Sequence, residues 1–452
     1  RGGRQRDQLV KICLLMYMGN MYSGGQGIYI DYLSREFVRM GHEVHVISGP
    51  PCLELDERVT VHRVEAFNFF LDPVSTLAAY RAPWRILSPL NFYEFAATRV
   101  GMFPLMFAYS FRAARRLAEL QRTHRFDVVH DNQHLGYGLL LMKRMGLPVV
   151  ATLHHPLKID RAEAIAQAAG PLEFTRHMLF YPFVMQDIVT PRLDRVITVS
   201  NSAAAAIEQA FPVSRSDTLR VVYNGVDTDQ FHPDAGAEKV PGRIIYVANT
   251  EDRKKGARFL LEALSLLQRE GEEFHLVLVD RDKDDLELVP GLLQQWGLDG
   301  RVTVTGRLSR EELAALYRSS ELAVSPSLYE GFGFPAAEAM ASGVPTIATT
   351  AGAFPEVIEH GESGWLVPPG NPVALAEAIS LFLGCRDLRG RFGAAGRSRI
   401  AGRFSWQRAA EETIAVYEEV IPPRRRSVAM PRRLPEQTPV GPAPAATGVE
   451  PV

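Results

Sequence analysis

The sequence predicts an α/β protein made of two doubly wound parallel-sheet units in tandem. Its 452 residues are about three times the length of a usual domain. Short, nearly continuous apolar segments alternate with segments of helical periodicity, a pattern typical of parallel strands with helices on both faces of the sheet. The alternation lapses at residues 212–228 and then starts again.

The first unit begins with a strand expected at residues 11–18, a glycine turn at 23–27 and a helix at 28–40. Residues 41–49 form the next expected strand. Further strands are expected at residues 127–130, 148–153 and 195–200. Between residues 69 and 120 the pattern gives way to an aromatic-rich helical elaboration of this unit.

The second unit repeats the pattern with a strand at residues 243–249, a helix at 257–268 and a strand at 275–280. Further strands are expected at residues 302–305, 322–325 and 346–349. We divide the chain into a flexible N-terminus (1–8), a first domain (9–214), a second domain (215–403), a C-terminal helix (404–421) and a tail (422–452). The tail is rich in proline and arginine and is expected to be disordered.

Composition narrows the range of functions. Fifty basic and 52 acidic residues leave a formal charge of -2, so no overall positive field attracts nucleic acid. Cys13, Cys52 and Cys385 are too few for a disulfide framework or a zinc knuckle, and they fit a reducing cytoplasm. The richest apolar run, residues 100–111, is shorter than the roughly 18 residues of a membrane span and contains Pro104. We therefore expect a cytoplasmic protein.

The most informative motif contains two carboxylates, Glu330 and Glu338, with seven residues between them. Gly331 and Gly333 let backbone N–H groups approach a ligand, and a helix starting near Pro335 directs its positive end to the same place. This arrangement suits an anionic ligand. Glu338 can accept both hydroxyls of a ribose, and Glu330 can meet a sugar ring. The alternative is an ordinary helix start with a proline and an acidic first turn.

With this motif the chain resembles the large family of group 1 (family 4) retaining nucleotide-sugar glycosyltransferases, which have the GT-B fold. The resemblance covers roughly residues 11–420. It includes Gly24-Gly25, Thr152 to His154, Val199 to Asn201, Asn224 to Asp227, Lys255-Gly256, Gly306, Glu330 to Glu338 and Gly343 to Pro345.

The resemblance implies two Rossmann-like domains facing across a cleft, with an acceptor-side domain at 9–214 and a donor domain at 215–403. The helix at 404–421 is expected to pack back on the first domain. The implied reaction transfers a hexose from a nucleoside-diphosphate sugar to an acceptor hydroxyl with retention, and a cell-envelope lipid or glycan is a candidate acceptor. The nucleotide sugar is a co-substrate, so no further cofactor is expected.

The resemblance also assigns roles to particular residues. His154 contacts the transferred sugar near the reacting carbon, Lys255 neutralises the diphosphate, and Glu330 binds the donor sugar; these are the expected catalytic residues. The expected donor-binding residues are Gly24, Gly25, Arg253, Lys255, Glu330, Gly331, Phe332, Gly333 and Glu338. A lysine and glycine-loop amides would stabilise the charge of a departing nucleoside diphosphate.

Two departures from the family pattern concern the donor site. Ala248-Asn249 stands where the family usually has Gly-Arg, so one diphosphate-binding cation is missing from its expected place. Arg253 or Lys254 can substitute from the same loop, or the loop is a solvated charge run. The charged stretch 280–285 replaces a glycine turn and affects the base or ribose contacts more than the reaction.

The sequence predicts no metal site. A metal at His154 and His155 would need further ligands, and only His130 and His134 lie nearby in the sequence. A nicotinamide cofactor is disfavoured because Ile30 replaces the last glycine of the dinucleotide fingerprint.

A basic helical stripe leaves membrane contact open. Arg112, Arg115, Arg116 and Arg122 recur at helical spacing beside phenylalanines, which fits either a peripheral contact with anionic lipid or a solvated helix face over a core. Two alternatives to the transferase remain: a nucleotide-sugar 2-epimerase of the same fold and a non-catalytic nucleotide-sugar-binding protein.

Overall fold

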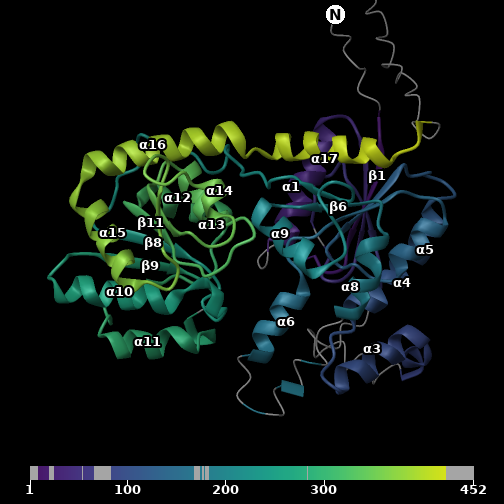
Figure 1. Ribbon diagram of the computed structural model, residues 1–452, viewed down its shortest axis with the longest axis horizontal. Coiled ribbons are helices and arrows are strands. Elements are labelled where there is room, and N and C mark those ends of the chain that lie inside the picture. The colour runs from purple at the N-terminus through teal and green to yellow at the C-terminus, as the bar shows by residue number, and fades with distance from the viewer. Residues whose placement is uncertain are drawn as a thin grey trace, which may run out of the picture.

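The computed structural model describes residues 9–19, 25–52, 54–65, 83–166, 183–281 and 283–423, together with positions 170, 174, 175 and 178. It confirms the predicted fold class, because each half of the chain forms its own parallel sheet with helices packed around it (Figure 1). The expected flexible N-terminus and all but the first two residues of the expected disordered tail lie outside the described residues.

The first sheet has the strand order β3-β2-β1-β4-β5-β6-β7, and every neighbouring pair is parallel. Its strands are β1 (Lys11–Met16), β2 (Glu43–Ser48), β3 (Thr60–Arg63), β4 (Val128–Asn132), β5 (Val149–Thr152), β6 (Arg195–Thr198) and β7 (Leu219–Val221). The central strands are almost entirely buried, because helices cover both faces.

The helices of this domain are α1 (Gln26–Arg39), α3 (Pro89–Arg99), α4 (Leu105–Leu120), α5 (Gly138–Arg144), α6 (Leu157–Ala166), α8 (Phe183–Val189) and α9 (Asn201–Ala210), with short 3-10 turns η1 (Pro83–Leu87) and η2 (Thr190–Arg192). Helix α4 packs its apolar face into one core of the sheet through side chains such as Tyr109 and Leu117. The described part of the aromatic-rich region is therefore helical; residues 66–82 lie outside the described residues.

The second sheet has the order β10-β9-β8-β11-β12-β13, again all parallel. Its strands are β8 (Arg243–Val247), β9 (His275–Val279), β10 (Val302–Val304), β11 (Leu322–Ser325), β12 (Thr346–Thr349) and β13 (Trp365–Val367). Its helices are α10 (Ala257–Arg269), α11 (Leu288–Trp296), α12 (Arg310–Ser319), α13 (Phe334–Ala341), α14 (Phe354–Val357), α15 (Pro372–Gly384) and α16 (Arg386–Arg403), with 3-10 turns η3 (Arg253–Lys255) and η4 (Lys283–Asp285).

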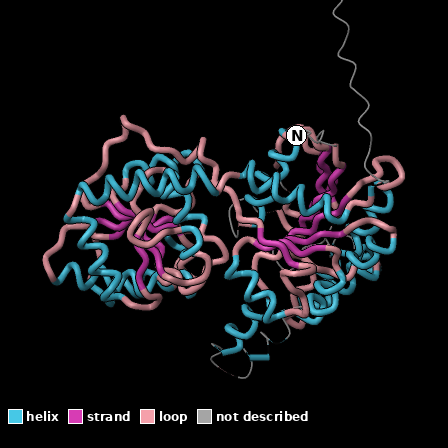
Figure 2. The backbone as a smooth tube through the Cα atoms, turned by 45° about the horizontal axis from the view of Figure 1, so that its top comes forward, coloured by secondary structure: helices cyan, strands magenta, loops and turns pink. Residues whose placement is uncertain are grey.

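The chain crosses between the domains twice. The first sheet extends past the expected boundary at residue 215, because β7 pairs with β6 in that sheet. After α16 the chain returns, and α17 (Trp406–Val420) packs beside α1 of the first domain (Figure 1). The Trp406 ring stacks on Tyr32 of α1 with ring centroids 5.3 Å apart. The backbone view shows the two sheets as separate groups of strands, one in each half of the molecule (Figure 2).

Candidate active site

A lysine and a glutamate pair beyond the carboxyl ends of the strands of the second domain, where open α/β sheets bind ligands. Lys255, in the loop after β8, places its Nζ 2.8 Å from Oε1 of Glu330, which follows the neighbouring strand β11. The same oxygen accepts a hydrogen bond from the Ser327 hydroxyl at 3.0 Å. Both charged groups are partly exposed, so an incoming anion can compete with Glu330 for the ammonium group.

The local backbone fixes the position of Lys255. Asp252 accepts a hydrogen bond from the Lys254 backbone N–H at the start of η3. Gly256 ends this turn with φ of 75°, and a Cβ at this position would lie 2.1 Å from the carbonyl oxygen of Pro326. The Tyr246 hydroxyl donates to the Lys255 carbonyl at 2.7 Å. Glycine after the lysine is therefore required for the loop to approach the β11 end this closely.

The loop from Glu330 to Gly333 leads directly into α13. Gly333 precedes the helix with φ of 88°, and a Cβ there would lie 2.5 Å from the Phe354 ring. Phe332 is buried against Phe404 with ring centroids 5.8 Å apart, so it anchors the loop. Glu330 thus lies on the loop that leads to the positive end of α13, where the first N–H groups have no partner within the helix.

The two domains meet at this loop. A Cβ built on Gly331 would lie 3.3 Å from the carbonyl oxygen of His154 in the first domain. A Cβ on Gly25, the residue that precedes α1, would lie 3.5 Å from the ring of Phe334. Two predicted residues of the first domain, Gly25 and His154, thereby lie beside the segment from Gly331 to Phe334. Gly24 lies outside the described residues.

The hydrogen bonds of His154 determine its tautomer. Asn132 donates through Nδ2 to the carbonyl oxygen of Gln26 at 3.1 Å, which leaves Asn132 Oδ1 as an acceptor. This oxygen lies 2.9 Å from Nε2 of His154, so Nε2 carries the proton and Nδ1 carries a lone pair. Desolvation of the ring, with a smaller contribution from His155 and then His130, lowers the pKa of His154 to about 3. The imidazole is therefore neutral at physiological pH.

Glu338 is buried in α13, with 6% of its surface exposed. Arg310 of α12 lies 3.4 Å from its Oε1. Burial raises the pKa of Glu338 to about 7, although Arg310 acts in the opposite direction. The Arg310 guanidinium also lies over the rings of Tyr32 and Phe231, 5.3 and 4.9 Å from their centroids. Because Tyr32 belongs to α1, the surroundings of Glu338 include the first domain.

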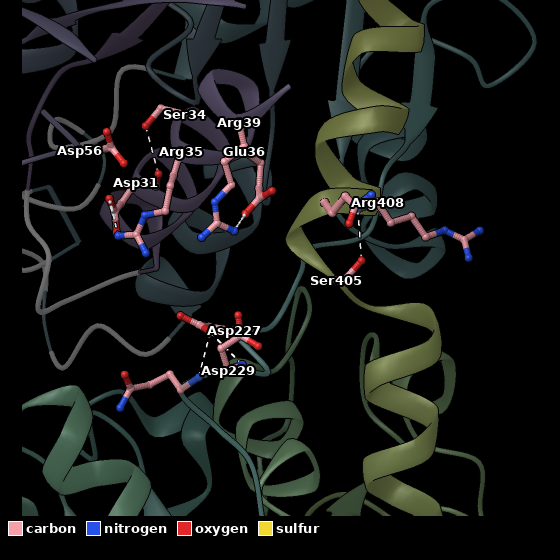
Figure 3. A network of polar contacts seen from close by, with 12 residues as sticks. Asp31, Ser34, Arg35, Glu36, Arg39, Asp56, Asp227, Asp229, Ser405 and Arg408 are labelled. Carbon is pink, nitrogen blue, oxygen red and sulfur yellow. Dashed lines mark hydrogen bonds and ion pairs between the residues drawn. The ribbon is translucent and has the colours of Figure 1, made fainter. Parts of the chain in front are cut away.

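The polar residues near the contact between the two domains bond mainly to neighbours in their own segment (Figure 3). Asp31 and Arg35 pair within α1 at 3.0 Å. In the linker, Asp227 accepts hydrogen bonds from the backbone N–H groups of Asp229 and Gln230 at 3.1 and 2.9 Å. The Asp227 side chain therefore fixes the turn by which the chain enters the second domain.

The structure identifies a cation that sequence reasoning missed. Arg281 donates to Oδ1 of Asn249 at 2.8 Å, whereas the expected substitute Arg253 is exposed. The proximity follows from the sheet register: Val247 of β8 pairs with Val279 of β9, and Asn249 and Arg281 each follow two residues later. The sequence does show a basic residue, Arg281, just after the next strand. Its proximity to Asn249 could be inferred only once β8 and β9 were known to be neighbours.

The histidines considered as metal ligands are engaged separately. His130 bonds Tyr417 through Nδ1 and lies 2.7 Å from the Thr152 hydroxyl through Nε2, and His134 contacts Asp131. Within the described part of the chain, another set of histidines gathers with the spacing of metal ligands: His45, His62 and His124. The prediction of no metal site did not consider this set.

Only some arginines of the predicted basic stripe are exposed to solvent. Arg112 is 11% exposed and binds both carboxylate oxygens of Glu94 at 2.7 Å, so it is not available to lipid. Arg115 is 86% exposed and faces solvent. Phe107 packs against the core of the first domain. None of the described helices is long and apolar enough to cross a membrane.

Family models match both halves of the chain. Residues 227–399 match the model described as glycosyl transferases group 1, and residues 23–95 and 88–230 match glycosyltransferase family 4. Together with the fold and site, these matches define the class: the chain belongs to the group 1 glycosyltransferases of GT-B fold, and it is a glycosyltransferase.

Individual proteins extend the comparison. The MMP alpha-(1->4)-mannosyltransferase of Mycolicibacterium hassiacum is 41% identical over 91% of this chain and 98% of its own. A D-inositol 3-phosphate glycosyltransferase of Streptomyces scabiei is 26% identical over 89% and 88%. Among solved structures, sucrose-phosphate synthase from Thermosynechococcus elongatus has a TM-score of 0.70 at 22% identity, over 90% of this chain and 98% of its own. Anabaena HepE with UDP-glucose has a TM-score of 0.63 at 18% identity, over 90% and 99%.

Proposed function

We propose that this glycosyltransferase transfers a hexose, with mannose as the first candidate, from a nucleoside-diphosphate sugar to an acceptor hydroxyl with retained anomeric configuration. The observation that carries the proposal is the Lys255–Glu330 pair. Gly331, the residue after Glu330, lies beside the carbonyl group of His154 in the first domain. The relative named as a mannosyltransferase, at 41% identity over nearly its whole length, supports mannose.

Donor binding rearranges the Lys255–Glu330 pair. The diphosphate takes the Lys255 ammonium, and the Glu330 carboxylate becomes free to accept hydroxyl groups of the donor sugar. Negative charge grows on the leaving phosphate in the transition state, where Lys255 and the N–H groups at the start of α13 stabilise it. Arg281, which donates a hydrogen bond to the Asn249 side chain, supplies a second cation at the same end of the sheet.

His154 acts as a neutral hydrogen-bonding group. Its Nδ1 lone pair accepts a hydrogen bond from a sugar hydroxyl, while Asn132 holds the ring through Nε2. Retention then proceeds by attack on the face from which the phosphate departs. The bond between the anomeric carbon and the phosphate oxygen breaks, the acceptor oxygen bonds to that carbon, and the acceptor proton passes to the departing phosphate oxygen. This route requires no protein nucleophile.

The acceptor is proposed more broadly, as a sugar, glycan or lipid of the cell envelope. Peripheral contact with an anionic membrane stays a prediction, and it depends on Arg115, Arg116 and Arg122 now that Arg112 is engaged by Glu94. The chain is expected to act in the cytoplasm, with the nucleotide sugar as co-substrate and no further cofactor.

A donor panel tests the proposal. The purified protein is incubated with UDP, GDP and ADP sugars, with and without cell-envelope extract, and release of nucleoside diphosphate and labelled product is followed. The proposal predicts acceptor-dependent release with one preferred nucleotide. Conversion of the donor to its 2-epimer would favour the epimerase, and nucleotide binding without turnover would favour a binding protein.

A further inference from the structure

Three histidines gather at the edge of the first sheet, in a region that the transfer reaction does not use. His45 lies in β2, His62 lies in the edge strand β3, and His124 follows α4. One ring nitrogen of each lies within 4.8 Å of those of the other two. The amino-terminal half of β2 carries His45, away from the carboxyl ends of the strands where donor and acceptor meet.

The sheet register brings the first two rings together. His45 pairs with Thr60, so His62 is its diagonal neighbour on the same face of the sheet. Nδ1 of His45 lies 2.8 Å from Nε2 of His62, and the two ring planes differ by 11°. The His124 ring lies beside them, with its centroid 4.4 Å from that of His45.

A carboxylate sets the tautomer of the central ring. Oε1 of Glu43 lies 3.2 Å from Nε2 of His45, and Lys11 pairs with the other carboxylate oxygen at 3.0 Å. Because a carboxylate only accepts hydrogen bonds, Nε2 carries the His45 proton and Nδ1 directs its lone pair towards His62. A carboxylate behind an imidazole in this way is the usual outer partner of a metal-ligating histidine.

We propose that His45, His62 and His124 bind a divalent late transition metal such as Zn²⁺, with Glu43 as the outer partner of His45. Neutral imidazoles suit zinc, nickel, cobalt or copper and not magnesium or calcium. The proton on Nε2 of His62 moves to Nδ1 of the same ring, and the metal takes its place between His45 and His62. A water completes the tetrahedron, because His62 and His124 are partly exposed.

His45 and His62 need only a small adjustment to bind one metal. Zinc–nitrogen bonds of about 2.05 Å in a tetrahedron place ligand atoms about 3.3 Å apart. The 2.8 Å separation of His45 and His62 therefore widens by about half an ångström, and His62 can turn because it lies on an edge strand. The bound metal joins β2, β3 and the segment after α4, so its role is to hold the edge of the sheet.

Metal titration of the untagged full-length protein tests this site. After treatment with a chelator, Zn²⁺ is titrated by calorimetry and Co²⁺ by its visible absorption. We expect one equivalent to bind, with affinity lowered at least about tenfold in His62→Ala and His124→Ala and about 10 to 100-fold in Glu43→Gln. His232→Ala, at an exposed histidine elsewhere in the chain, should bind like the wild type.

The outcomes are decisive in both directions. Circular dichroism establishes that each variant is folded, and His124→Ala carries the test if His62→Ala disturbs the edge strand. Absence of stoichiometric binding in the wild type, or equal affinity in the wild type and both alanine variants, overturns the proposal. Donor turnover is independent of these measurements, so a failed transferase assay does not decide them.

Discussion

Replacement of Glu338 by glutamine tests how burial of this carboxyl controls donor binding. Burial raises the pKa of Glu338 to about 7 from its ordinary value of 4.5. If only the ionised carboxylate accepts the ribose hydroxyls, about a tenth of the protein is competent at pH 6 and about nine tenths at pH 8. The donor Kd of the wild type should therefore rise about tenfold between pH 8 and pH 6.

Glu338→Gln should remove this dependence. The amide cannot ionise, so its donor Kd should stay constant over the same range, and it should be about 10 to 150-fold weaker than the wild type at pH 8 for the loss of ~1.5–3 kcal/mol. Calorimetry with an intact nucleotide sugar measures both, because the phosphates of such a donor are esterified and do not titrate near neutral pH. Glu311→Gln, an exposed position in α12, is the control.

The free energy of unfolding gives a second measure without ligand. A carboxyl whose folded-state pKa is raised contributes stability that is fully present below the ordinary pKa of 4.5 and is lost as pH rises towards about 7. The wild type should therefore lose stability relative to Glu338→Gln over this window. A donor Kd with the same pH dependence in both proteins would refute the assignment of Glu338 to the ribose.

The remaining predictions concern the other proposed contacts. Lys255→Ala should lower kcat/KM roughly 100-fold or more in donor turnover, because it removes the cation opposite the leaving phosphate, and an unchanged value would exclude it from the site. Arg281→Ala should raise the donor KM, whereas Arg253→Ala should have little effect; the reverse result would restore the original assignment. Asn132→Ala should lower kcat because His154 loses the partner that orients its ring. Asn132→Gln should not restore activity, because the longer side chain displaces the ring. Full activity of Asn132→Ala would contradict the positioning role.

The sequence was sufficient for most of the fold because the buried parallel strands are mostly apolar. Strand β11 was predicted at its observed bounds and β9 to within one residue. The strands β3, β7 and β13 were missed because they are short and only partly buried. Strand β7 can be recognised as a strand only from its pairing with β6. The domain boundary was therefore placed before β7.

The sequence motif places some of the candidate site residues close together. Glu330 and Glu338 lie on one loop and helix, and glycines mark the turn. The contacts of Arg281 with Asn249 and of His45 with His62 and His124 depend on which strands are neighbours, and no local pattern contains that information. The residue types could be read from the sequence, whereas the contacts between neighbouring strands could not.

The stereochemistry of the first product shows directly whether the sugar is transferred with retention. The donor selected by the nucleotide panel is turned over with water or a simple alcohol as acceptor, and proton NMR follows the anomeric signal before mutarotation can obscure it. We expect the transferred sugar to keep the anomeric configuration of the donor while one nucleoside diphosphate is released per sugar transferred. A product of inverted configuration, or a donor that is epimerised without transfer, would contradict it.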